Sequence, residues 1–314
     1  MSKVDFVALI GNVNASILNV ELGDGFRIEE WPIEKFVGFY EYMHGSAEHD
    51  IWFKLDDAWG YGHGRMYRPK NVYVVTKVLE EFPSHDLEKG QEKWLEAFRK
   101  RDIAESRVTN LLEDKIIKLR LLSEGSIKVC VEFFYSNDDG DLEMESSREE
   151  GLHCENRLYK IKKSDLDLIN NLLKSPPINS RRKYINFAIN NFSQAYRVAH
   201  TDLEFITLMI ALEAIFNDGK QELRNKVSRG CAVLLGKTKA SSRKIFKDVR
   251  DLYDKRSVLV HTGDTKKISR DDVLSLQSYV RRGLLRVLEL DLTKDDLSVR
   301  LTENGFGSYS KIKS

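Results

Sequence analysis

Arg256 and His261, five residues apart, are the pair in this chain whose types and spacing best suit chemistry on a phosphate. The segment around them has apolar residues at helical spacing, and continuing that stripe by three or four residues reaches Arg256. An arginine in phase with a buried stripe breaks the local pattern, as functional and interface positions often do. The stripe consists of Ile245, Phe246, Val249, Leu252 and Tyr253.

The chemistry that this pair could perform is cleavage of RNA. A histidine titrates near neutral pH, so it can take a proton from a ribose 2′-OH or give one to a leaving oxygen. An arginine can hold a phosphate and stabilise the charge that builds on it. Neither role requires a metal ion or a cofactor, and we expect none.

Geometry limits how the two groups can act. On one helix they lie about 140° apart around the axis at roughly 100° per residue. The arginine would have to bend toward the helix end, or a second copy of the helix would have to supply the other group across a two-fold axis.

A purely structural interpretation stays open. Arg256 could pair with Asp254 or Glu213, and His261 could simply favour the negative end of its helix. The spacing alone is weak, because Arg148 and His153 repeat it in an acidic segment, where we interpret it as coincidence.

The elements expected around the pair are helices with short connections, typical of a bundle. Thr201 with Glu204, and Ser269 with Asp272, read as capping boxes. Ser241 or Ser242 would open the helix that carries the pair, and Gly263 would close it. The expected helices cover 181–199, 203–216, about 220–235, 241–262, 273–290 and 293–305.

The first half reads as mixed α and β structure. Helices are expected at 32–43, in the first part of 87–122, and after a capping box formed by Ser164 and Asp167. Residues 137–151 read as an acidic turn or loop. The expected strands are 6–13, 16–23, 25–31, 71–79, 126–135 and 157–161.

Charge and proline divide the chain at the same place. Residues 1–180 hold 24 Lys and Arg against 33 Asp and Glu, whereas residues 181–314 hold 26 against 16. All five prolines lie at or before Pro177. We therefore expect an α+β chain with a mixed α/β domain at 1–176 and an all-helical domain at 177–314, the basic half suiting a polyanion such as RNA.

Composition excludes several classes of protein. The chain is 41% hydrophobic and 32% charged, which suits a globular protein with a core. No run is long enough to span a bilayer, and the N-terminus does not resemble a signal peptide. Three separated cysteines, Cys130, Cys154 and Cys231, argue against a disulfide framework and a zinc site. A cytoplasmic location without a membrane partner fits best.

The second half resembles a known family. The segments LEFITLMIALEAIFNDGKQELRNKVSRGCAVLLG (203–236), RKIFKDVRDLYDKRSVLVHTGD (243–264) and SYVRRGLLRVLEL (278–290) are similar to the Apea-like branch of the HEPN superfamily. The resemblance covers about 181–305.

The resemblance implies a helical bundle that dimerises and, in many members, a metal-independent endoribonuclease that leaves a cyclic phosphate and a 5′-OH. Arg256 would stabilise the phosphate, His261 would act as acid and base, and Glu213 would orient the arginine. Ser257 stands where family members often have Asn, Asp or His. The family implies a role in stress response, as a toxin or in phage defence. For the first domain, which the resemblance does not cover, we expect a role in sensing a ligand or a regulatory protein. The alternative is a non-catalytic module that binds RNA, a nucleotide or a protein.

Overall fold

The computed structural model describes two compact units, Met1–Ser175 and Pro176–Ser314. The prediction of an α+β chain is confirmed, because a sheet-containing unit precedes a helical one. The described residues are 2–44, 69–82, 91–138, 141–149, 157–178, 181–198, 200–217, 219 and 222–305.

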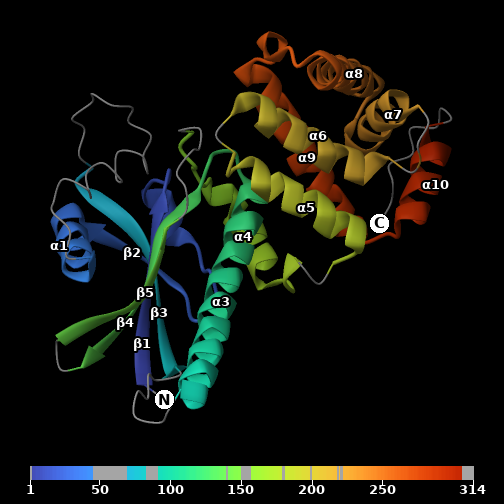
Figure 1. Cartoon of the computed structure of the whole chain (residues 1–314). Helices are drawn as coiled ribbons and strands as arrows, with labels where there is room; N and C mark the ends of the chain where they lie inside the picture. Colours follow the sequence, from blue (N-terminus) through green and yellow to red (C-terminus); the bar gives the residue numbers. More distant parts are fainter. Residues whose placement is uncertain are drawn as a thin grey trace. The chain divides into compact units, whose positions relative to one another are not determined.

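The first unit is built on an antiparallel sheet in the order β2-β3-β1-β4-β5 (Figure 1). Its strands are β1 (Ser2–Gly11), β2 (Arg27–Pro32), β3 (Asn71–Phe82), β4 (Lys128–Asp138) and β5 (Asp141–Glu149). Its helices are α1 (Ile33–His44), α3 (Gln91–Leu122) and α4 (Leu166–Lys174), with short 3-10 helices η1 (Ala15–Asn19) and η2 (Lys163–Asp165).

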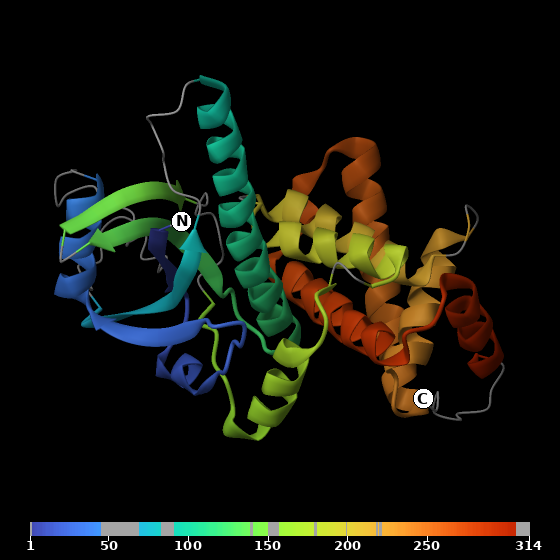
Figure 2. The ribbon, with the colours of Figure 1, turned by 90° about the horizontal axis from the view of Figure 1, so that it is seen from below.

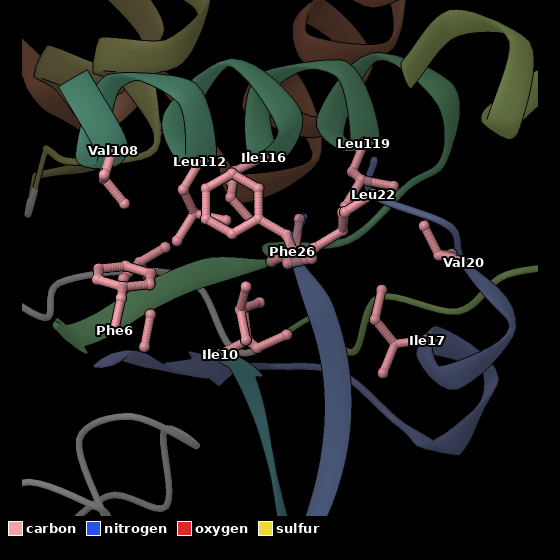
Figure 3. Packing of buried hydrophobic residues seen from close by; sticks show 14 of the residues in the cluster. Phe6, Ile10, Ile17, Val20, Leu22, Phe26, Val108, Leu112, Ile116 and Leu119 are labelled. Atoms are coloured by element: carbon pink, nitrogen blue, oxygen red, sulfur yellow. The ribbon is translucent and has the colours of Figure 1, made fainter. Parts of the chain in front are cut away.

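Both faces of the central strand β1 are covered, by α1 on one side and α3 on the other (Figure 2). Phe6 and Ile10 face the core that α3 closes, and Figure 3 shows them opposite Leu112 of that helix. Val7, between them in sequence, belongs to the core under α1. Two buried faces explain why this strand is an unbroken apolar run rather than an alternating one.

Two elements of this unit differ from the sequence prediction. The expected strand at 16–23 is wrong: the side chain of Asn14 accepts a hydrogen bond from the backbone of Ser16 and opens the 3-10 helix η1 instead. The expected acidic loop at 137–151 is also wrong, because Asp141–Glu149 forms the edge strand β5. An edge strand tolerates charged side chains, so its acidity is a poor guide to its structure.

Smaller expectations of this unit are also corrected. The helix expected in the first part of 87–122 runs on to Leu122, and 157–161 contributes only a bridge from Tyr159 to Val13. Ser164 and Asp167 form no capping box, since α4 begins after Asp165 with no side-chain cap.

The second unit consists of helices that surround α6 (Figure 1). Helix α6 contacts α5, α7, α8 and α9, and its apolar residues are spread around its circumference. A helix that is apolar on all sides belongs in the interior of a bundle. The bounds are α5 (Lys183–Ala195), α6 (Thr201–Phe216), α7 (Leu223–Leu235), α8 (Lys239–Thr262), α9 (Arg270–Leu290) and α10 (Lys294–Asn304), with the 3-10 helix η4 (Thr265–Lys267).

Caps fix the helices that carry the candidate site. The capping box of Ser269 and Asp272 at the start of α9 is confirmed. Gly263 ends α8 with φ of 69°, a left-handed conformation that suits glycine. The cap at the start of α8 is Thr238, with Ser241 as its capping-box partner rather than as the cap.

The box expected from Thr201 and Glu204 is wrong. Helix α6 begins after His200, which makes no side-chain cap. Glu204 instead forms an ion pair with Arg270 of α9.

Gly230 of α7 is required by close packing against α6, which gives a stability prediction. A Cβ atom at Gly230 would lie 2.9 Å from Cδ1 of the buried Phe216, whereas one at Gly283 of α9 would lie 3.4 Å from Cδ1 of Ile215. Both substitutions to alanine gain the same helix propensity, of about 1 kcal/mol. We expect Gly230→Ala to be less stable than Gly283→Ala by about 1–3 kcal/mol, because only the first overpacks the core. Urea unfolding measures this difference, and equal stabilities would contradict the packing around Gly230.

Candidate functional site

Helix α8 positions both candidate residues. Its buried stripe, Ile245, Val249, Leu252 and Tyr253, packs into the bundle, and the helix continues without interruption through His261 to Thr262. Arg256 follows the stripe as the sequence predicts, so its side chain is directed toward α6 rather than into solvent.

Glu213, near the end of α6, is the residue that Arg256 meets. The Arg256 Nε atom lies 3.8 Å from Oε1 of Glu213, and the two side chains are only 27% and 18% exposed. The guanidinium also lies over the ring of Tyr253, with 5.7 Å between Cζ and the ring centre. The expectation that Glu213 orients the arginine stays a prediction, and this contact is consistent with it.

Electrostatics around this contact favour the neutral form of the Tyr253 phenol. Burial, and then the charge of Glu213 and hydrogen bonding to it, raise the pKa of Tyr253 to about 12, whereas Arg256 opposes that shift. Oε1 of Glu213 is sealed from solvent and accepts no hydrogen bond. Within the described residues the Nη groups of Arg256 donate no hydrogen bond either. Glu213 therefore lies on the Nε side of the Arg256 guanidinium, and no described residue accepts a hydrogen bond from its Nη groups.

His261 lies in a different environment. It occupies the last turn of α8, is exposed, and forms no hydrogen bond or ion pair with any described residue. Since α8 is regular between the two residues, His261 is displaced from Arg256 by about 140° around the axis and about 7.5 Å along it. A single chain therefore does not bring the pair together.

The other expected site residues are placed as follows. Asp254 pairs with Arg224 of α7, 3.0 Å from Oδ1 to Nη1, and not with Arg256. Ser257 is half-buried, and its hydroxyl forms no hydrogen bond within the described part of the chain. His153, the histidine of the second such spacing, lies outside the described residues, as does Cys154.

Lys255, next to Arg256, fastens α8 to α9. Its Nζ atom lies 2.6 Å from Oδ2 of Asp272, the capping-box partner of Ser269 at the start of α9. Burial acts to raise the pKa of Asp272, but the hydrogen bonds from Lys255 and Ser269 outweigh it and hold the pKa below its usual range. The contact fixes the rotation of α8 in its C-terminal half, where Arg256 and His261 lie.

Two residues of this site, Tyr253 and Arg224, are not identified by sequence analysis. The sequence places Tyr253 in the apolar stripe, although its position three residues before Arg256 puts the two side chains side by side on a helix. Arg224 lies 30 residues before its partner Asp254, so no local spacing could reveal that pair.

Comparisons with known proteins add no assignment. No family model, no curated protein and no solved structure matches the chain. Across the described ranges, no group of three or more His, Cys, Asp or Glu residues is arranged to hold a metal ion. Nor does any helix among those residues have the length and apolar character needed to cross a membrane.

The Lys255 contact predicts how stability depends on pH. A carboxyl group whose pKa is lower in the folded state contributes stability above its ordinary pKa of about 3.9, and this is lost as pH falls through the folded value. We expect Lys255→Met to make the slope of unfolding free energy against pH shallower between about pH 5 and pH 3, because the carboxylate loses its main partner. Urea unfolding at several pH values measures that slope.

The matched control is Lys244→Met, which removes an exposed lysine that has no partner among the described residues from the same helix. It should leave the slope as in the unmodified protein. If both variants behave alike, the effect comes from net charge, and Lys255 does not act through Asp272.

Proposed function

We propose that the Pro176–Ser314 unit is a HEPN-like bundle that dimerises and cleaves RNA without a metal ion, with Arg256 and His261 as its catalytic residues. The observation that carries the proposal is the state of these two side chains. A half-buried carboxylate lies beside the Nε edge of a guanidinium whose Nη groups donate no hydrogen bond to a described residue, and an imidazole without a partner among those residues lies on the same helix.

The reaction follows from the chemistry of the two groups. The ribose 2′-oxygen attacks the adjacent phosphorus while His261 takes its proton, and the bond to the 5′-oxygen of the next nucleotide breaks. The imidazolium then gives this proton to the departing 5′-oxygen, which leaves a 2′,3′-cyclic phosphate and a 5′-OH and returns His261 to its starting state. Arg256 binds the phosphate oxygens and stabilises their charge in the transition state.

A second copy of α8 is part of the proposal. Because Arg256 and His261 point to different sides of one helix, a two-fold axis beside this segment would let the imidazole of one protomer approach the guanidinium of its partner. We further propose a cytoplasmic protein that acts in stress response, as a toxin or in phage defence. The Met1–Ser175 unit would then serve as a sensor for a ligand or a regulatory protein.

The alternative function is a non-catalytic HEPN-like module that binds RNA, a nucleotide or a protein. What favours it is that Arg256 already has a carboxylate partner within its own chain, as a structural arginine does.

Cleavage of labelled RNA in EDTA tests the proposal. We expect the unmodified protein to cut, and His261→Ala and Arg256→Ala each to lose about 10²-fold or more in rate, as acid–base and phosphate-binding residues do. The matched controls are His200→Ala, an exposed histidine before α6, and Arg300→Ala in α10; neither side chain forms a hydrogen bond or ion pair with a described residue. Both controls should cut normally.

A mixture of the two inactive variants tests the composite site. Co-expressed Arg256→Ala and His261→Ala protomers should regain activity, because a mixed dimer contains one intact pair. Binding without cleavage would support the non-catalytic module, and activity that disappears in EDTA would indicate a metal-dependent nuclease instead.

A further inference from the structure

The exposed face of α8 carries four cations in line, which we call the basic stripe: Lys239, Arg243, Lys247 and Arg250. They are spaced by four, four and three residues, so they follow one side of the helix. All four are exposed, and none forms an ion pair or hydrogen bond with a described residue.

This lack of partners contrasts with other cations of the unit, which have acidic neighbours. Arg224 pairs with Asp254, Lys255 with Asp272, and Arg270 with Glu204. The bundle thus neutralises those cations and leaves the ones of the basic stripe uncompensated by any described residue. Two carboxylates lie beside the stripe: the exposed Asp251, and the half-exposed Asp254, which lies between Arg250 and His261 and is paired with Arg224.

The basic stripe leads to His261. Eighteen residues, five full turns, separate Arg243 from His261, so both lie on the same side of α8. Arg250 is offset from His261 by only about 20° and lies about 16 Å before it along the helix axis. Arg256, by contrast, faces α6 and does not belong to this line.

The ligand chemistry that fits is a linear polyanion. Successive cations of the stripe are about 6, 6 and 4.5 Å apart along the axis, a spacing of the same order as that of neighbouring phosphates along an extended single strand. A membrane surface fits poorly, because interfacial helices insert large apolar side chains beside their cations. The apolar face of α8 is buried in its bundle, and Val260 is the large hydrophobic residue of α8 that is exposed.

We propose that the basic stripe binds the phosphates of one RNA strand and directs that strand lengthwise to His261. The direction of the strand rests on the proposed nuclease function, whereas binding by the stripe does not. The four residues are positioning residues that contact substrate away from the reacting bond.

Salt dependence of binding tests the stripe. Each phosphate contact on a single strand contributes about −0.7 to the slope of log K against log salt concentration. Measured by fluorescence anisotropy with a 20-nucleotide single-stranded RNA in EDTA, the quadruple variant Lys239→Gln, Arg243→Gln, Lys247→Gln, Arg250→Gln should reduce the slope by about 3. A His261→Ala background prevents cleavage during the measurement.

The matched control removes four other cations of the same unit outside α8: Lys183→Gln, Arg197→Gln, Arg281→Gln, Arg300→Gln. It should keep the original slope. An unchanged slope in the stripe variant, an equal change in the control, or tighter binding of the protein to phosphatidylserine vesicles or polyglutamate than to RNA would each overturn the proposal.

Substrate length separates this proposal from the nuclease function. A dinucleotide at His261 is too short to span the roughly 16 Å to Arg250, so the stripe variant should cleave it as well as the unmodified protein does. The same variant should cleave the 20-nucleotide RNA at least tenfold less efficiently. If the stripe variant lost cleavage equally on both substrates, or on neither, the proposal that the basic stripe guides the RNA strand would be overturned. Absence of cleavage by any variant, with the slope still reduced, would overturn only the nuclease function.

Discussion

The carboxylate of Glu213, in the central helix α6, constrains how α8 packs in the second unit. Glu213 belongs to α6, which other helices surround, and one of its oxygens accepts no hydrogen bond. A carboxylate that is largely withdrawn from water is stabilised by a nearby opposite charge, and Arg256 supplies one from α8. The pair ties the rotation of α8 to α6, while Lys255 and Asp272 tie the same turn to α9. The position of His261 at the end of α8 follows from these two contacts.

The sequence predicts most of this arrangement, because strong periodicity and caps are local signals. The apolar run of β1, the stripe from Ile245 to Tyr253 and the Ser269–Asp272 box all act within a few residues, and each is found where expected. What the sequence cannot show depends on distant partners. Strand β5 forms because it pairs with β4. Glu204 does not take part in a capping box because its side chain pairs with Arg270.

In the candidate site too, the features set by local spacing could be predicted, whereas those set by distant residues could not. Sequence reasoning identifies Arg256 and leaves two acidic partners open, Asp254 and Glu213. Local spacing cannot separate them, since the choice depends on Arg224 of α7, which occupies Asp254 and leaves Glu213 to Arg256. The exposure of His261 likewise depends on how α8 packs, because a histidine at a helix end can be covered or free.

Paired cations occur in both units, but their surroundings differ. In the first unit, Lys115 and Lys118 of α3 are buried; they donate to the carbonyls of Leu173 and Ser175 and pair with carboxylates. Those two lysines satisfy backbone carbonyls at the C-terminal end of α4. In the second unit, the cations of the basic stripe have no such task among the described residues. Net charge alone would not distinguish these cases; only the partners of each cation do.

The contact between Arg256 and Glu213 also limits how the proposed site could be assembled. Bringing Arg256 to its own His261 would take it from Glu213 and leave this carboxylate, whose Oε1 atom is sealed from solvent, without its cation, at a cost in desolvation. The imidazole has no partner among the described residues to lose. In the proposed reaction a phosphate must therefore approach the guanidinium where Glu213 holds it, and the histidine beside it must come from another protomer. Dimerisation would then be a chemical requirement of cleavage, because one chain holds its two reactive groups on different sides of one rigid helix.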